Sequence, residues 1–422
     1  MSRGTEALAR AGRAVTRRLG MRSRPTRVAQ PAWDAWRAGD LPLARELAAN
    51  LLATGHAVDE ARHVLVLADS VLGNYDGAIN THRMIAPRYE RLDELNEPIL
   101  CAHIHRGDIA GAVTLAERRG LARRGAIGAR LRLAVERPLG IDIDGVVDVP
   151  FTDDPLTPFM PGFAGHLNDR PTVLRLDTGG SFVHLSRELA AAHGIDTIAS
   201  AREFAALGRH RVGYGLADLE IGTIRLRNVP VAVHEKGLPP AAAFDVPLGP
   251  IVGTNILERF LTTVDAPNRR LVLSRRGDNI ARARHLARLG AAQHVAPFGL
   301  WSDHLMIARG RVDGISGVNL FVDSGLVALT PDQGQVAMLV PRRTLARWGV
   351  ARPQTGRFAE LPGTLAIGTA SREGMTAYPV TDRVWRDFGD WGGIRVDALI
   401  SWGYLRHFTW TIDFERREYL FA

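Results

Sequence analysis

The pattern of hydrophobic and polar residues divides the chain into two parts. In residues 31–120 a Gly-Asp or Gly-Asn pair recurs at Gly39, Gly73 and Gly107, an interval of 34 residues each time. From about Gly140 onward, short runs rich in Val, Ile, Leu and Thr alternate with turns of Gly, Pro, Asn and Asp. Short apolar runs between turn residues are typical of an all-β domain. The pattern therefore predicts an α-helical part followed by a larger β-rich part.

The 34-residue interval predicts α-helical hairpins. Glycine ends a helix where the backbone needs a positive φ, and the Asp or Asn after it caps the next helix. The alanines Ala44, Ala78 and Ala112 keep the same interval and allow two helices to pack closely. In period and residues, the segment 31–120 resembles about three degenerate tetratricopeptide repeats. The resemblance implies a concave surface for peptides or partner proteins. The alternative is a helical cap that only packs on the next domain.

Two segments of the β-rich part run from an apolar strand into an Asp-Thr/Ser-Gly tripeptide. Residues 171–181 read PTVLRLDTGGS and contain Asp177; residues 317–326 read GVNLFVDSGL and contain Asp323. In each segment the strand delivers a carboxylate to a loop, and the glycine allows a tight turn behind it. A single tripeptide of this kind is a common turn, so its meaning depends on its context.

Each tripeptide is followed, further along the chain, by a second motif, and the two second motifs share the same pattern. Residues 251–265 read IVGTNILERFLTTVD and residues 399–413 read LISWGYLRHFTWTID, so that Leu, Phe, Thr and Asp coincide when the final Asp residues are aligned. These final residues, Asp265 and Asp413, follow the tripeptide aspartates by 88 and 90 residues. Two buried turn aspartates would explain either segment alone but not the duplicated order, which predicts two related lobes.

These residues resemble the pepsin and retropepsin superfamily of aspartic proteases. Each lobe is most similar to bacterial retropepsin-like proteins, but two lobes are fused in one chain, as in pepsins. The resemblance covers residues 140–422 and implies a bilobal β-barrel acid-protease fold. It implies that Asp177 and Asp323 form a catalytic dyad that activates water to hydrolyse a peptide bond, without a metal or cofactor. The residues expected to support the dyad are Thr178, Gly179, Ser324 and Gly325.

The resemblance also implies a flap, a hairpin that covers the substrate. Gly213, Tyr214 and Gly215 are the candidate flap tip of the first lobe, because glycines would hinge a hairpin and the tyrosine would contact substrate. The alternative is an ordinary loop with a surface tyrosine. The equivalent in the second lobe is expected near residues 356–363. A peptide substrate would lie extended between the lobes and pair its backbone with the flap.

Three positions depart from the pattern of the superfamily. Leu326 stands where Ala, Ser or Thr is usual and would crowd the dyad. Gly180 lacks a hydroxyl that would support Asp177, and Ser401 replaces a glycine that usually follows two hydrophobes. None of the three removes a carboxylate. The leading hypothesis is an aspartic-type endopeptidase whose helical repeats recruit or restrict substrates. The alternatives are a catalytically inactive peptide-binding module of the same fold and a repeat-based scaffold.

The expected domain organisation follows from these features. It comprises a basic, disordered leader (1–29), helical repeats (30–122), a linker (123–140), the first lobe (141–276), a linker with a short helix (277–293) and the second lobe (294–422). One chain supplies both aspartates, so a monomer suffices for the dyad. The expected partners are a peptide or protein substrate between the lobes and a protein bound to the repeats.

Composition and charge give no indication of a membrane-spanning or nucleic-acid-binding protein. An apolar share of 46% and a charged share of 23% are those of a globular domain, and no apolar run is long enough to span a membrane. The net charge of +8 comes almost entirely from arginines spread along the chain, which do not form a nucleic-acid-binding stripe. Cys101 is the single cysteine, which excludes an internal disulfide and predicts a reducing, cytoplasmic location.

Two pairs of residues that could bind a metal ion occur in the sequence, one of histidines and one of aspartates. His103 and His105 lie on a predicted helix that would point their rings apart, and no cluster of Cys or carboxylates completes a site. We therefore interpret them as surface histidines, and Asp153 and Asp154 as surface aspartates.

Overall fold

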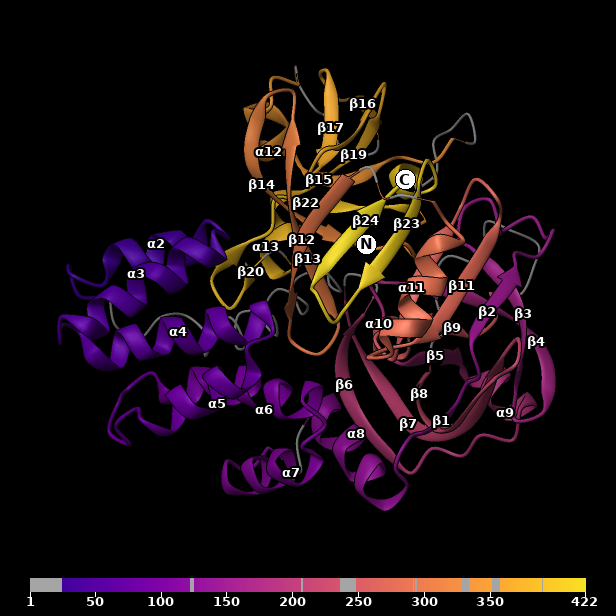
Figure 1. The fold of residues 1–422 in the computed structure, drawn as a ribbon, viewed down its shortest axis with the longest axis horizontal. Helices are drawn as coiled ribbons and strands as arrows, with labels where there is room; N and C mark the ends of the chain where they lie inside the picture. Colours follow the sequence, from indigo (N-terminus) through magenta and orange to yellow (C-terminus); the bar gives the residue numbers. More distant parts are fainter. Residues whose placement is uncertain are drawn as a thin grey trace, which may run out of the picture.

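The computed structural model describes residues 25–121, 125–205, 208–235, 248–290, 292, 294–327, 334–350, 357–388 and 390–422. The chain forms a helical part and two β-rich lobes that lie side by side (Figure 1). Within the described ranges, no helix combines the length and the apolar character that crossing a membrane requires. The helices of the first part are α2 (Gln30–Arg37), α3 (Leu41–Ala53), α4 (Val58–Leu72), α5 (Tyr75–Arg83), the 3-10 helix η1 (Leu92–Leu95), α6 (Asn96–His105), α7 (Ile109–Arg118) and α8 (Gly125–Glu136).

The repeated Gly-Asp/Asn pairs form the turns between helices, as predicted. The three glycines have φ values of 71°, 90° and 81°, a conformation that glycine adopts at little cost. Asp40, Asn74 and Asp108 each accept a hydrogen bond from the backbone amide three residues further on, at 3.4, 3.3 and 2.9 Å. The three alanines of the repeat are fully buried. The helical hairpins are confirmed, and their assignment to the tetratricopeptide family stays a prediction.

The first lobe contains an eight-stranded sheet in the order β1-β8-β5-β9-β4-β3-β7-β6, and an additional pairing of β7 with β8 closes this sheet on itself. Its strands and helices are β1 (Gly140–Asp142), β3 (Gly162–Leu167), β4 (Arg170–Asp177), β5 (Val183–Ser186), α9 (Arg187–Ala192), β6 (Ala199–Ala205), β7 (Gly208–Ile221), β8 (Ile224–His234), β9 (Ile251–Gly253) and α10 (Thr254–Leu257).

The second lobe repeats the core of this arrangement. In both lobes the strand that leads to the Asp-Thr/Ser-Gly tripeptide pairs in parallel with the short strand of the later motif: β4 with β9, and β14 with β22. The elements of the second lobe are β12 (His294–Trp301), β13 (Leu305–Val312), β14 (Ile315–Val322), β15 (Met338–Pro341), α12 (Arg342–Arg347), β16 (Ala359–Glu360), β17 (Thr364–Ile367), β18 (Ala370–Glu373), β19 (Thr376–Val380), α13 (Asp382–Phe388), β20 (Asp390–Trp391), β21 (Ile394–Arg395), β22 (Ala398–Ile400) and α14 (Trp402–Leu405).

A central run of six strands joins the lobes, in the order β12-β24-β23-β10-β11-β2. It contains β2 (Val146–Pro150), β10 (Phe260–Asp265), β11 (Arg270–Arg275), β23 (Thr409–Asp413) and β24 (Glu418–Phe421). The strands that close the two duplicated motifs, β10 and β23, are antiparallel neighbours in which Thr263 lies opposite Thr411. The two buried hydroxyls are 2.6 Å apart. Equivalent residues therefore meet at the centre, as an internal duplication requires.

The helical part packs on both lobes. Trp33 and Trp36 share a buried cluster with Phe321, Leu339 and Ile394 of the second lobe, and the indole of Trp36 donates to the carbonyl of Gly392 at 2.8 Å. On the other side, α8 packs on the first lobe. The interpretation of residues 123–140 as a linker is wrong, because α8 occupies most of them. The connection 277–293 does contain the expected helix, α11 (Asn279–Ala287).

The histidines of α6 are not surface residues, which corrects the prediction. The side chain of His105 is 2% exposed, and its Nδ1 lies 3.0 Å from the Glu258 carboxylate of the first lobe, while Nε2 donates to the carbonyl of Ser302 at 3.0 Å. Burial opposes the charge on His105, but Glu258, the Ser302 carbonyl and Asp303 together outweigh it, so the pKa of His105 is raised. His103 is also buried and bonds to Asp108 at 2.8 Å. His105 therefore joins the helical part to the lobes, whereas the bond of His103 lies within the helical part.

Candidate active site

The two tripeptide aspartates lie at the ends of equivalent strands and meet between the lobes. Asp177 ends β4, and Asp323 directly follows β14. A Cβ built on Gly179 would lie 2.4 Å from Cγ of Asp323, and one on Gly325 would lie 2.2 Å from Cγ of Asp177. Each loop therefore needs glycine because the carboxylate of the other lobe occupies the place of a side chain. The structure brings together the two residues that the sequence placed 146 positions apart.

The hydroxyls beside the aspartates cross-link the two loops. The Thr178 hydroxyl donates to the carbonyl of Val322 at 2.9 Å and accepts from the backbone amide of Ser324 at 3.0 Å. In return, the Ser324 hydroxyl accepts from the amide of Thr178 at 3.0 Å and donates to the carbonyl of Leu176 at 3.4 Å. Both side chains are fully buried. The four hydrogen bonds fix the loops relative to each other.

The aspartates themselves are half-buried, so they differ from their buried neighbours in access to solvent. Asp177 Oδ1 accepts from the amide of Gly179 at 2.7 Å, and Asp323 Oδ1 accepts from the amide of Gly325 at 3.0 Å. Burial raises the pKa of Asp323 well above its usual value, and the neighbouring Asp177 carboxylate raises it further, since it repels a second negative charge and bonds to the protonated form. The pair is therefore arranged to hold one shared proton.

Two of the departures from the superfamily pattern have a structural explanation. Ser401 begins α14: its hydroxyl accepts from the amide of Gly403 at 3.0 Å and donates to the carbonyl of Val336. A buried serine is thus satisfied on both sides, and Gly403 is the position without space for a side chain, since a Cβ there would lie 2.2 Å from the Val336 oxygen. The side chain of Leu326 packs against the apolar cluster that contains Leu399.

Two histidines, His184 and His234, lie near Gly180, and the sequence analysis did not identify them. A Cβ on Gly180 would lie 3.2 Å from Asp177 Oδ2 and 3.5 Å from the ring of His184. The backbone amide of Ser181 can only donate, and it points to His184 Nε2 at 3.2 Å. Nδ1 of His184 therefore carries the hydrogen and donates to Nε2 of His234 at 2.8 Å.

Burial, helped by nearby cationic side chains, lowers the pKa of His184 to about 3. Its ring is consequently neutral beside the dyad. No sequence signal pointed to this pair, because His184 and His234 lie on different strands, β5 and β8, which only the parallel pairing of the sheet brings together.

The prediction that Gly213, Tyr214 and Gly215 form the tip of a flap is wrong. Residues 213–215 lie inside β7, where Gly213 and Tyr214 pair with β6 and all three residues pair with β8. Tyr214 is 1% exposed and packs against Ala129 and Leu133 of α8. Residues 206–207, between β6 and β7, lie outside the described residues. The equivalent expectation for the second lobe includes residue 356, also outside them; residues 359–367 contribute β16 and β17.

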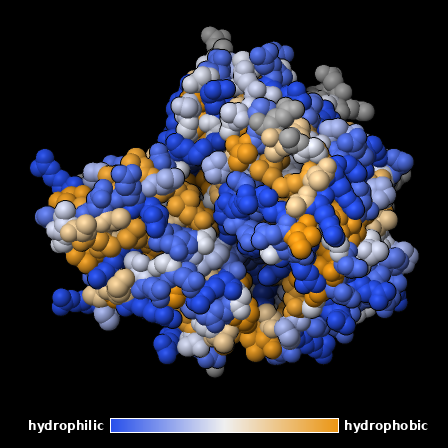
Figure 2. Space-filling model, in the orientation of Figure 1, coloured by the Kyte–Doolittle hydropathy of each residue, from blue (hydrophilic) through white to orange (hydrophobic). Residues whose placement is uncertain are grey.

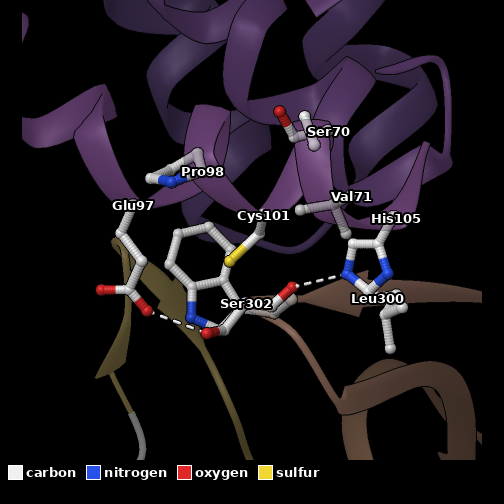
Figure 3. Close-up of a pocket in the computed structure, with 10 residues that line it drawn as sticks. Ser70, Val71, Glu97, Pro98, Cys101, His105, Leu300 and Ser302 are labelled. Carbon is white, nitrogen blue, oxygen red and sulfur yellow. Dashed lines mark hydrogen bonds between the residues drawn. The ribbon is translucent and has the colours of Figure 1, made fainter. Parts of the chain in front are cut away.

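A small cavity lies at the junction of the helical part with the second lobe, apart from the dyad (Figure 3). Its volume is about 10 Å³, room for about one water molecule. Its lining includes Cys101, whose pKa burial raises, together with His105 and Ser302. In the described part of the chain, no group of three or more His, Cys, Asp or Glu side chains is placed to hold a metal ion.

The paired tripeptides lie where the two lobes meet, and the comparisons find aspartic proteases that are similar to part of the chain. Residues 163–251 match the family described as aspartyl protease. Among solved structures, the chain is similar to a retropepsin-like aspartic protease from Rickettsia conorii, with 19% identity over 32% of this chain and 90% of that one, at a TM-score of 0.23. No curated protein matches the sequence.

Proposed function

We propose that this protein is an aspartic-type endopeptidase with Asp177 and Asp323 as its dyad. One observation carries the proposal: each tripeptide loop leaves room for the carboxylate of the other, and buried hydroxyls hold the two loops together. This arrangement keeps two half-buried carboxylates in contact despite their repulsion. A turn aspartate with only a structural role would not need a second carboxylate at that place.

The chemistry follows from the shared proton. One carboxyl of the pair holds the shared proton, and the other, ionised, accepts a proton from a bound water. The water attacks the peptide carbonyl while the protonated carboxyl donates to the carbonyl oxygen. The neutral His184 ring adds no cation next to the dyad, so it does not suppress the basicity of the ionised carboxylate.

The substrate in this proposal is an extended peptide between the lobes that pairs with the hairpin β6–β7. Helix α8 supports the base of that hairpin, since Ala129 and Leu133 cover Tyr214, Val212 and Ala232. The helical part would thus act on substrate selection through the hairpin and through its own surface. On the face shown in Figure 2, hydrophobic residues gather over the helical part. Among the residues of the helical part, Leu43 and Met84 are 42% and 54% exposed.

The test is digestion of a diverse peptide library, followed by mass spectrometry, from about pH 4 to about pH 7.5, a range that brackets a shared-proton dyad. Wild type is compared with Asp177→Asn and Asp323→Asn. Asp169→Asn is the matched control, because Asp169 is exposed and its φ of 60° suits asparagine.

We expect cleavage by wild type and by the control, and none by either dyad variant. Cleavage that survives a dyad variant would contradict the mechanism. Folded wild-type protein that binds peptides from the library but cuts none would identify a peptide-binding module of the same fold.

A further inference from the structure

A groove with a volume of about 620 Å³ lies on the second lobe, between α12, α13 and the chain after β21. Its apolar surface includes Trp385 and Val396, which are 8% and 1% exposed. The indole of Trp385 donates to the carbonyl of Val396 at 2.8 Å, which fixes the ring. None of the residues that line the groove belongs to the two tripeptide loops, so the groove is separate from the proposed active site. Its volume is in the range of ligand-binding sites, about 300–1,000 Å³.

Four arginines line this groove: Arg343, Arg347, Arg386 and Arg395. Two carboxylates line it as well, which leaves an excess of two positive charges. Three of the arginines are already oriented by these carboxylates. Arg347 and Arg395 approach the buried Asp397 at 3.3 and 2.9 Å, and Arg343 approaches Asp382 at 3.2 Å.

The four arginines of the groove have N–H donors that their carboxylate partners do not occupy. A guanidinium has five N–H donors, and one carboxylate partner occupies at most two of them in parallel. Arg386 is exposed and forms no ion pair or hydrogen bond with any described residue. The side chains of Arg343, Arg347 and Arg395 are 86%, 52% and 56% exposed. The groove thus combines an apolar floor with preoriented cationic donors at its rim.

We propose that this groove binds a short acidic peptide segment with one hydrophobic residue among its carboxylates. The hydrophobic side chain would lie on Trp385, and the flanking carboxylates would pair with Arg343 and Arg386. A nucleic acid fits less well for two reasons. Asp382 and Asp397 repel a continuous phosphate backbone, and the arginines form a small cluster rather than a stripe. The proposal does not depend on catalysis, so binding is measured directly.

The experiment uses the full chain carrying Asp177→Asn, which prevents digestion of the probe. The probe is a fluorescein-labelled Glu-Glu-Leu-Glu-Glu peptide, followed by fluorescence anisotropy at low and high salt. Gln-Gln-Leu-Gln-Gln and Glu-Glu-Ser-Glu-Glu are matched peptides that remove either the charge or the hydrophobe. A short single-stranded oligonucleotide of equal charge tests the nucleic-acid alternative.

The test variant is Arg343→Glu with Arg386→Glu. The control variant is Arg187→Glu with Arg225→Glu in the first lobe. Arg225 is a close match for Arg343, because it is 73% exposed and lies 3.2 Å from Glu220. Both double variants change the net charge equally, so a general effect of protein charge would weaken binding in both.

We expect the test variant to weaken binding of the acidic peptide at least about tenfold, and the control variant to change it less than about twofold. Both altered peptides should bind more weakly than the probe, and salt should weaken binding of the probe. Equal effects of the two double variants, or no binding of the probe to folded protein, would overturn the proposal. So would tighter binding of the oligonucleotide through the same two arginines.

Discussion

The hydroxyl of Thr178 offers a sharp test of how the two aspartate loops are held together. Thr178→Val keeps the shape of the side chain but removes the hydroxyl. The change leaves the buried amide of Ser324 and the buried carbonyl of Val322 without their partners at 3.0 and 2.9 Å. An unsatisfied buried polar group costs roughly 1–3 kcal/mol, so the two together cost roughly 2–6 kcal/mol.

Ser324→Ala provides an internal comparison on the other lobe. It leaves the amide of Thr178 unpaired, at 3.0 Å in the wild type, but its other bond, to the carbonyl of Leu176, is long at 3.4 Å. The expected cost is therefore smaller, roughly 1–3 kcal/mol. The two loops are related by the duplication, yet the structure predicts unequal effects.

Hydrogen exchange measured by mass spectrometry reports the local opening of both loops. Peptides that cover residues 171–181 and 317–326 should lose protection at least about tenfold in Thr178→Val, because each 1.4 kcal/mol corresponds to about a factor of ten. Thr114→Val, at an exposed helical position, is the control and should change protection little. The reasoning fails if Thr178→Val behaves like the control, or if Ser324→Ala has the larger effect.

Three further predictions concern stability. His105→Gln should lower the free energy of unfolding by about 3 kcal/mol, because the buried Glu258 carboxylate loses its cationic partner at 3.0 Å and keeps only Arg276 at 3.3 Å; the exposed His166→Gln should change it little. Leu133→Ala should cost about 2–5 kcal/mol and increase hydrogen exchange in β6 and β7, whereas the exposed Leu43→Ala should do neither. Asp323→Asn should raise the thermal unfolding midpoint at about pH 8 but not at about pH 3. Because the pKa of Asp323 is raised in the folded protein, this residue destabilises the fold only as the pH rises through that pKa. Equal changes in the unfolding midpoint at both pH values would contradict this reasoning.

The helix turns and the two aspartate loops could be predicted from the sequence because short-range rules determine them. A glycine with positive φ and an Asp or Asn cap are properties of a few consecutive residues, and they recur at a fixed interval. The duplicated motifs were detectable because the same steric requirements apply twice. Gly179 and Gly325 are each confined by the opposite carboxylate, so neither position accepts a side chain.

The position of the flap hairpin could not be predicted in the same way. Gly213, Tyr214 and Gly215 look like a hinge in the sequence, but glycine also occurs where another backbone comes close. A Cβ on Gly215 would lie 2.3 Å from the carbonyl of Asp196. The register of β7 between β6 and β8 depends on all three strands together, and this register buries Tyr214 under α8.

By itself, the sequence determined the order of the parts, the duplication and the two aspartates, since each depends on local pattern and spacing. Only the tertiary structure decided the surroundings of the side chains. It buried His105 against Glu258, paired His184 with His234 beside the dyad, and gathered Arg343 and Arg386 around one groove. Burial, pKa and electrostatic surroundings depend on residues that are distant in the chain, and packing alone brings those residues together.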